Sequence, residues 1–251
     1  MLDICSLFSS SKGNCTYVFS DTTKLLVDIG ISSKRLTERL IKDNIQPEEI
    51  QAILITHEHS DHTKGIRVFS KKFNVPVFAS EKTWGTLVSL EIPDKLKHTF
   101  SVGTSFKIGD ICINPFSIPH DAIDPCGFSM TSGKNKVTVA TDMGHLTKDL
   151  LYNFEASDSI LLEANHDVAM LRSGNYPYFL KERVIGNFGH LSNALSAEAV
   201  EYLIKKGTKK FILAHLSEEN NIPELALETV RSRLLTNNID LSDISIEVAK
   251  P

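Results

Sequence analysis

Residues 56–62 read Thr-His-Glu-His-Ser-Asp-His, and this stretch carries four potential metal ligands within six positions. The apolar run before it, residues 50–55 (Ile-Gln-Ala-Ile-Leu-Ile), predicts a buried strand. A helical pattern begins near Thr63. The ligand-type side chains are therefore expected on a loop that leaves the end of a strand; they are His57, His59, Asp61 and His62.

Imidazole nitrogens and a carboxylate oxygen suit borderline divalent ions such as Zn²⁺, Mn²⁺ or Fe²⁺. Four ligands this close along the chain cannot all reach one ion comfortably. They can be divided between two ions that lie ~3.5–4 Å apart, as in two-metal hydrolytic sites. The alternative is a polar surface loop in which three histidines and one aspartate occur together by coincidence.

The composition is that of an ordinary globular protein: of 251 residues, 41% are hydrophobic and 23% are charged. No stretch approaches the ~18–20 apolar residues that a membrane span needs. The first residues lack a basic region followed by an apolar run, so we expect no signal peptide and a cytoplasmic location. The formal charge of −4 argues against a general affinity for polyanions, although bound metals can make a cleft locally positive.

The four cysteines are scattered without C-x-x-C spacing. We expect them to be small buried or half-buried hydrophobic side chains in a reducing compartment. They are Cys5, Cys15, Cys112 and Cys126.

Strand and helix patterns alternate along both halves of the chain. The predicted strands are 2–8, 15–19, 24–29, 50–55, 75–79, 105–108, 111–118, 126–131, 136–141, 159–163 and 210–214. The predicted helices are 32–43, 65–73, 81–90, 146–154, 176–188, 192–206 and 224–236. This order predicts an α/β protein of one domain, residues 1–251, with two sheets face to face and helices outside.

Three further ligand-type residues directly follow predicted strands. His120 follows the run 111–119, Asp142 follows 137–141, and His215 follows 211–214. A single histidine is more often structural than metal-binding, so each residue alone is a weak signal. Strand-end loops of both halves can converge on one edge, however, and seven such residues together would complete a two-metal site.

These motifs, in this order, resemble the metallo-β-lactamase superfamily over nearly the full length of the chain. The resemblance implies an αββα four-layer sandwich, two divalent metal ions per chain, and an early aspartate, Asp28, that orients the metal loop. It also implies two ligand sets that share one carboxylate: His57, His59 and His120 for one metal, Asp61, His62 and His215 for the other, and Asp142 bridging both.

The chain more closely resembles the YycJ/WalJ branch of that superfamily, and this resemblance is carried by residues 6–14, 56–65, 163–167 and 189–193. The branch implies a bacterial cytoplasmic 5′→3′ DNA exonuclease with a repair role, acting on DNA ends or single strands. Zn²⁺ or Mn²⁺ is the expected metal, with Fe²⁺ as a further candidate. The N-terminal loop departs from the branch at Ser10, where a glycine is expected.

Two large features of other nucleases in the superfamily are missing from the sequence. An inserted cap domain would lie between Asp142 and His215, but only 73 positions separate these residues. A long basic, glycine-rich arm, as in the transfer-RNA-processing relatives, is also missing. The sequence therefore predicts the compact form of the fold.

The same resemblance suggests roles for residues outside the ligand set. Glu163 and His190 would form a carboxylate–histidine pair that protonates a leaving oxygen, and Asp61 would be catalytic as well as metal-binding. Capping of a helix or turn is the alternative for Glu163 and His190. Candidate substrate contacts are Ser11, Lys12, Asn14, His166 and Ser192, and further side chains that could reach phosphate, or remain solvated, are His145, Arg172, Lys181 and Arg183.

Two other functions are compatible with the predicted fold and metal ligands. A thioesterase or lactonase could use the same metals on small acyl substrates, and a regulatory protein could keep the fold without catalysis. A proton donor benefits a phosphodiester leaving group more than a thiolate, so the Glu163–His190 pair favours a phosphodiesterase. The complete ligand set disfavours a protein without catalysis.

Overall fold

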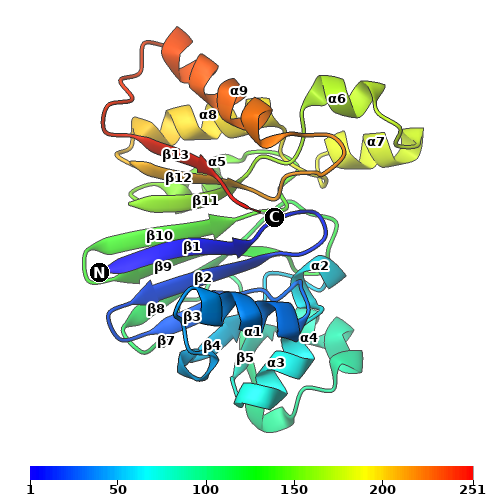
Figure 1. The fold of residues 1–251 in the computed structure, drawn as a ribbon, viewed down its shortest axis with the longest axis vertical. Coiled ribbons are helices and arrows are strands. Elements are labelled where there is room, and N and C mark those ends of the chain that lie inside the picture. Colours follow the sequence, from blue (N-terminus) through cyan, green and yellow to red (C-terminus); the bar gives the residue numbers. More distant parts are fainter. Residues whose placement is uncertain (251) are drawn as a thin grey trace.

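The strands of the computed structural model, which describes residues 1–250, form two mixed sheets that face each other (Figure 1). The first sheet has the order β1-β2-β3-β4-β5-β6 and the second the order β13-β12-β11-β10-β9-β8-β7. The strands of the first sheet are β1 (Leu2–Phe8), β2 (Cys15–Ser20), β3 (Lys24–Val27), β4 (Ala52–Leu54), β5 (Val77–Ser80) and β6 (Lys97–Phe100). Those of the second are β7 (Phe106–Ile108), β8 (Ile111–Ser117), β9 (Cys126–Ser132), β10 (Asn135–Ala140), β11 (Ser159–Glu163), β12 (Lys210–Ala214) and β13 (Ser245–Val248).

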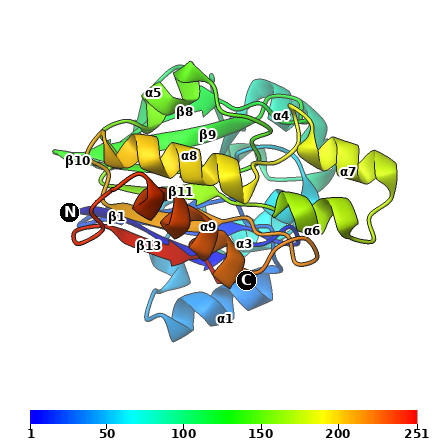
Figure 2. The ribbon, with the colours of Figure 1, turned by 90° about the horizontal axis from the view of Figure 1, so that it is seen from above.

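Helices cover the outer face of each sheet (Figures 1 and 2). On the first sheet, α1 (Ser33–Lys42) buries Leu36 and Leu40, and α3 (Ile66–Phe73) buries Phe69. On the second sheet, α8 (Asn193–Ile204) buries Val200 and α9 (Pro223–Thr236) buries Val230. The helices of the first half are α1 (Ser33–Lys42), α2 (Ser60–Thr63), α3 (Ile66–Phe73) and α4 (Glu81–Thr86). Those of the second half are α5 (Lys148–Phe154), α6 (Val168–Ser173), α7 (Tyr178–Ile185), α8 (Asn193–Ile204) and α9 (Pro223–Thr236).

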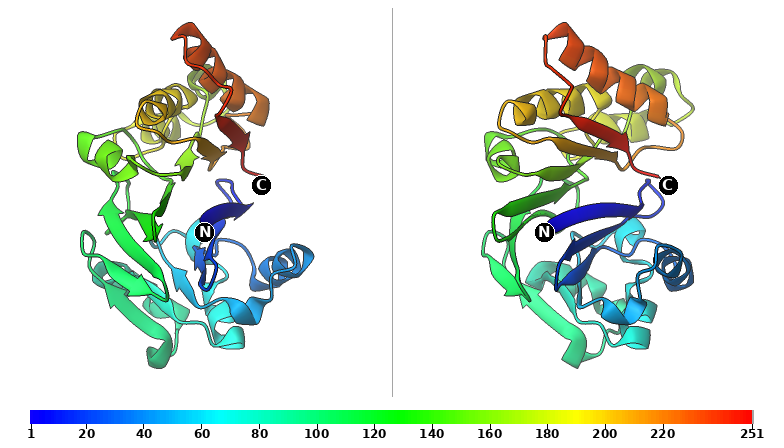
Figure 3. Two further views of the ribbon diagram at one scale, coloured as in Figure 1. Left: turned by 90° about the vertical axis from the view of Figure 1, so that its left-hand side faces the viewer. Right: turned by 60° about the vertical axis from the view of Figure 1, so that its left-hand side comes forward.

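A third apolar cluster fills the space between the sheets. Val18 and Leu25 of the first sheet pack in one cluster with Phe128 and Val139 of the second, and all four side chains are buried. Figure 3 shows the two sheets facing each other, with helices on both outer sides. The four layers confirm the predicted αββα sandwich.

The elements that the sequence did not predict are short or lie at sheet edges. α6 has six residues and buries only Leu171, and β13 alternates exposed with half-buried residues. β6 exposes three of its four residues, so its pattern is weak. The predicted helix 81–90 is instead α4 followed by a 3₁₀ turn at Leu87–Leu90, and the predicted strand 50–55 pairs regularly only at Ala52–Leu54.

Cys5 corrects the expectation that all four cysteines are buried or half-buried. Its side chain is exposed, whereas Cys15 and Cys126 are buried and Cys112 is intermediate. β1 is an edge strand of the first sheet, and its residues alternate between the two faces. Ile4 points into the core, so Cys5 must point away from it.

The direction of the strands determines where loops can meet. β3, β4 and β5 are parallel, and so are β10, β11 and β12. The carboxyl ends of parallel strands meet at one edge of a sheet, so the loops that follow them lie together. None of the helices within residues 1–250 has the length and apolar character needed to cross a membrane.

Candidate metal centre

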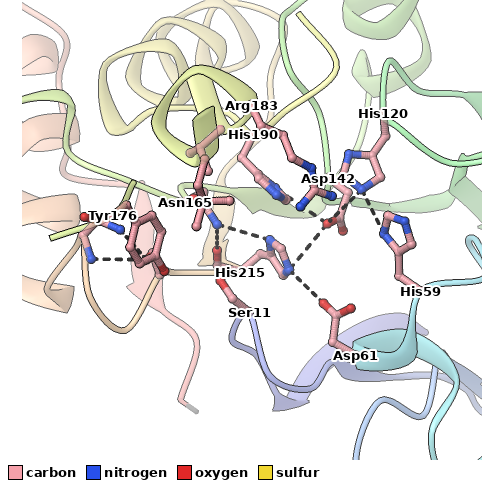
Figure 4. Close-up of a pocket in the computed structure, with 14 residues that line it drawn as sticks. Ser11, His59, Asp61, His120, Asp142, Asn165, Tyr176, Arg183, His190 and His215 are labelled. Carbon is pink, nitrogen blue, oxygen red and sulfur yellow. Dashed lines mark hydrogen bonds and ion pairs between the residues drawn. The ribbon is translucent and has the colours of Figure 1, made fainter. Parts of the chain in front are cut away.

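The seven predicted metal ligands come together at one edge of the two sheets (Figure 4). The loop after β4 and the helix α2 supply His57, His59, Asp61 and His62, while the second sheet supplies residues that follow β8, β10 and β12. Figure 4 shows His59, His120, Asp142, His215 and Asp61 with their polar atoms directed toward a common space. The segments that supply them are far apart in sequence, so the sandwich itself assembles the site.

One group consists of three histidines. His57 Nε2 lies 3.0 Å from His59 Nδ1, and His59 Nδ1 lies 3.3 Å from His120 Nε2. His120 also directs its Nδ1 to the backbone carbonyl of Gly189, at 3.3 Å. This contact orients the ring so that Nε2 faces the other two histidines.

The second group combines a carboxylate with two histidines. Asp61 Oδ2 lies 3.3 Å from His62 Nε2 and 3.5 Å from His215 Nε2. Asp142 lies between the groups: its Oδ2 is 3.3 Å from His62 Nε2, and its Oδ1 is 3.8 Å from His120 Nε2. Asp142 Oδ1 also lies 3.5 Å from His215 Nε2. This position is the one that a bridging carboxylate requires.

These distances fit metal coordination. Zn–N bonds of ~2.0–2.1 Å in a tetrahedral site place neighbouring ligand atoms ~3.3 Å apart. The separations of 3.0 and 3.3 Å in the first group and 3.3 and 3.5 Å in the second bracket that value. Asp142 Oδ2 and His215 Nε2 are buried without a hydrogen-bond partner. Buried polar atoms are rarely left without partners, so the arrangement fits two cations.

The electrostatics of the site also favour cations. Burial alone would lower the pKa of His62, but Asp142, Asp28 and Asp61 raise it well above its ordinary value. Burial likewise opposes the charge on His215, yet Asp142, Asp61 and Glu163 raise its pKa to about 10. In both cases the carboxylates hold a proton that supplies positive charge. A divalent cation would replace that charge and release the proton.

Asp28 orients the metal loop, as the resemblance implied. Its Oδ1 accepts a hydrogen bond from the backbone N–H of Thr56 (2.9 Å), and its Oδ2 accepts one from Thr56 Oγ1 (2.8 Å). His62 Nδ1 also donates to Asp28 Oδ2, at 2.8 Å. This contact fixes the tautomer of His62 and leaves its Nε2 free to face Asp61 and Asp142.

Three residues of the site have a left-handed backbone that few non-glycine residues adopt. The φ angles are 61° at Asp28, 62° at Asp142 and 57° at His215. Asp28 and His215 directly follow β3 and β12, and Asp142 lies two positions after β10, so the left-handed turn at each strand end helps to direct the side chain toward the centre. Such conformations typically cost ~1–3 kcal/mol each and persist where the surrounding structure holds them.

The N-terminal loop ties the two halves of the centre together. Ser9 Oγ accepts a hydrogen bond from the backbone N–H of His215 (2.7 Å), and the backbone N–H of Asn14 donates to Asp61 O (2.9 Å). The Nδ2 of Asn14 lies 3.2 Å from His62 Nε2. The sequence motif at residues 6–14 includes this loop, but it did not identify Ser9 as a functional residue, because the contact of Ser9 spans 206 positions.

Glu163 and His190 lie within hydrogen-bonding distance, with 2.8 Å between Glu163 Oε1 and His190 Nδ1. Glu163 Oε1 is also 3.0 Å from His215 Nδ1, and its Oε2 accepts from the backbone N–H groups of Met143 and Leu191. Burial alone would raise the pKa of Glu163, but His190 and His215 lower it to about 2. The sequence paired this carboxylate with His190 alone, whereas the structure also places it behind a metal ligand.

The centre opens into a pocket of about 190 Å³. This is smaller than the ~300–1,000 Å³ of typical small-molecule sites, so it suits a compact group such as a phosphodiester. Ser11, His190 and Arg183 line it, and the sequence had singled out all three. Asn165 and Tyr176 also line it, and Figure 4 shows them on the side opposite Asp61.

The other candidate substrate contacts lie outside the lining of this pocket. Lys12 forms an exposed ion pair with Glu218 beside a separate hollow, and Ser192 caps α8 by accepting from Leu195 N–H at 3.3 Å. His166 is buried, and its pKa is lowered to about 4 because burial disfavours the charged ring. The roles of these residues in substrate binding stay predictions.

Comparison with known proteins places the chain in a family. A family model described as "Beta-lactamase superfamily domain" matches residues 23–216. The chain therefore belongs to the metallo-β-lactamase superfamily, as the sequence motifs predicted.

Two similar proteins narrow the relationship, and one solved structure shares the fold. The exodeoxyribonuclease WalJ of Streptococcus pneumoniae is 41% identical over 232 residues, which cover 91% of this chain and 86% of that protein. The exodeoxyribonuclease YycJ of Bacillus anthracis is 40% identical over 227 residues, which cover 89% and 86%. Among solved structures, the metallo-β-lactamase fold protein YhfI from Bacillus subtilis superposes with a TM-score of 0.74 at 14% identity, covering 100% of this chain and 97% of that one.

Proposed function

We propose that this protein is a two-metal exodeoxyribonuclease that hydrolyses phosphodiester bonds at DNA ends. The observation that carries the proposal is the juxtaposition of two ligand groups around Asp142, in a chain about 41% identical to an exodeoxyribonuclease over nine tenths of its length. The ligands would be His57, His59 and His120 for one metal, Asp61, His62 and His215 for the other, and Asp142 for both.

Different side chains of the protein would have different roles in the hydrolysis. Divalent cations held in the centre supply Lewis acidity and lower the pKa of water. Ser11 and Arg183 line the pocket and would orient the phosphate. His190, held through its Nδ1 by Glu163, directs its other ring nitrogen away from that carboxylate and would protonate the departing oxygen. Asp61 would fix the position of the attacking group through its carboxylate.

The finer features of the proposal rest on the resemblance and on the donor set. We infer 5′→3′ polarity, a role in DNA repair, and action in the cytoplasm from the similarity to the YycJ/WalJ branch. The mixed nitrogen and oxygen donors support Zn²⁺ or Mn²⁺ rather than Mg²⁺, which prefers oxygen alone. We also propose that a single domain, without an inserted cap domain, binds the metals and cleaves the DNA.

The test is a cleavage assay on DNA oligonucleotides labelled at either end. Purified protein is incubated with 5′-phosphorylated and 5′-hydroxyl strands in Mn²⁺ or Zn²⁺, and the products are resolved over time. The expected result is stepwise release of nucleotides from the 5′ end, and Asp142→Ala should abolish it. Hydrolysis of lactones or thioesters without cleavage of DNA would instead support the acyl hydrolase.

A further inference from the structure

α6 and α7 form an arm that extends from the second half of the molecule (Figures 1 and 2), and residues of α7 line the metal pocket. We define the α6–α7 arm as residues 168–188. Only Leu171 and Val184 are buried within it. A segment that contributes so little to the core is free to serve binding.

Exposed aromatic side chains concentrate on this arm. Within residues 1–250, four large aromatic residues are exposed to solvent, and three of them lie between residues 178 and 188. Tyr178 is 77% exposed, Phe179 is 73% exposed and Phe188 is 61% exposed. The fourth, Tyr152, lies on α5. Large apolar surface left in water marks an interaction site when it is clustered in this way.

The two sides of α7 face different hollows. Leu180, Arg183 and Val184 line the metal pocket. The opposite side, spaced at helical intervals from Tyr178 through Lys181 to Ile185, lines a second hollow of about 500 Å³. The helix is therefore a wall shared by the two hollows.

The charge of the arm differs from that of the whole chain. Residues 168–188 contain Arg172, Lys181 and Arg183 against one acidic residue, Glu182, which gives +2 in a chain whose formal charge is −4. Lys181 Nζ donates to the backbone carbonyl of Arg172 at 2.7 Å, and both residues line the second hollow. Arg183 pairs with Asp121, outside the arm, at 2.6 Å, whereas within residues 1–250 neither Arg172 nor Lys181 forms an ion pair with a carboxylate.

We propose that the α6–α7 arm binds the single strand of a DNA substrate outside the metal pocket. Bases stack on Tyr178 and Phe179, and Arg172 and Lys181 bind phosphates. Alternating aromatic rings and cations are the chemistry by which proteins hold single strands without reading their sequence. The metal pocket is too small for more than the reacting group, so the rest of the strand needs such a surface. This inference rests on the proposed nuclease function.

The test compares DNA substrates that differ only in length. Rates are measured on a dinucleotide, which ends at the metal pocket, and on an oligonucleotide of about 12 nucleotides, within the ~4–16 nucleotides of known single-strand sites. A stacked base contributes ~1–3 kcal/mol, so Tyr178→Ala should lower the ratio of kcat/KM for the long strand to that for the dinucleotide by about 5- to 150-fold. The loss should appear in KM. Tyr178→Trp, which keeps a stacking ring, should restore the ratio.

Tyr152→Ala is the matched control, because Tyr152 is 76% exposed and lines a separate hollow with Lys136 rather than the metal pocket. It should leave the ratio unchanged. Arg172→Gln combined with Lys181→Gln should reduce the slope of log affinity against log salt by about 1.4, since each phosphate contact to a single strand contributes ~0.7.

The outcomes separate this inference from the function on which it rests. Wild-type protein that cleaves no DNA contradicts the nuclease. Wild-type protein that cleaves DNA, with the same ratio in Tyr178→Ala and Tyr152→Ala, contradicts only the role of the arm. The exposed aromatics could instead join two copies of the chain. Light scattering that shows a dimer in the wild type and a monomer in Tyr178→Ala would overturn the DNA-binding role in favour of that interface.

Discussion

Replacing Gly30 with alanine should displace one half of the metal centre without touching a ligand. Gly30 follows β3 and packs against the N-terminal loop and the metal loop, where its N–H donates to Asn14 O at 2.8 Å. A Cβ added at Gly30 would lie 1.6 Å from the backbone oxygen of Asp61 and 2.6 Å from the backbone nitrogen of Asn14. Both neighbours are main chain, so no side-chain rotation relieves the contact.

The size of the displacement follows from these distances. Carbon and carbonyl oxygen normally approach no closer than about 3.3 Å, so the Asp61 backbone must move by more than about 1.5 Å. Metal–ligand distances tolerate ~0.2 Å. Asp61 and His62 should therefore lose their metal, whereas His57 stays fixed through Thr56 and Asp28. Overpacking of this kind costs ~1–3 kcal/mol of folding free energy, or a Tm lower by about 2–12 °C.

Elemental analysis and a DNA cleavage assay measure the result. We expect the metal content of Gly30→Ala to fall from two ions toward one and the cleavage rate to fall by at least ~10–100-fold, the usual cost of disturbing the support of a ligand. Gly85→Ala is the control, because a Cβ there meets nothing within 4 Å and α4 should gain ~0.5–1 kcal/mol. Two bound metals and a normal rate in Gly30→Ala would refute the idea that this packing positions Asp61.

The remaining predictions concern the metals, the proton donor and the buried His166. Chelation should lower the Tm by about 11–22 °C, because metal at 100 times its Kd stabilises the fold by ~2.7 kcal/mol at each of the two sites. Asp142→Ala should show no such shift, and equal shifts in both proteins would argue against a bridging carboxylate. His190→Ala should keep both metals and slow cleavage by ~10²–10⁴-fold, with part of the loss recovered on a nitrophenyl phosphodiester, whose leaving group needs no proton; equal losses on both substrates would make His190 a structural residue. The pKa of His166 is about 4 in the fold against 6.5 for an ordinary histidine, so the unfolded chain binds the proton more tightly. In metal-free protein, the stability due to this residue should be full above pH 6.5 and lost toward pH 4, by at most about 3 kcal/mol, and His166→Asn should flatten the urea midpoint across that range.

Local patterns in the sequence sufficed for most elements and for the identity of the ligand-type residues. Apolar runs of period two and helical faces such as Leu36 with Leu40 mark elements whose burial is strong. Elements that bury little, such as α6 and β13, gave no such pattern. The exposed Cys5 was misjudged because the edge position of β1 comes from the order of strands in the sheet, which no local pattern encodes.

The donor atoms available to this protein follow from its residues alone, because donor type and order are properties of the chain: three histidines and an aspartate within residues 57–62, with His120, Asp142 and His215 after later strands. How these donors are arranged around a common space follows from the folded sandwich. The left-handed backbone at Asp142 and His215, and the contact of Ser9 with His215 across 206 positions, depend on two sheets closing on each other. Such contacts form between segments that no local propensity relates, so the geometry of the centre arises from packing.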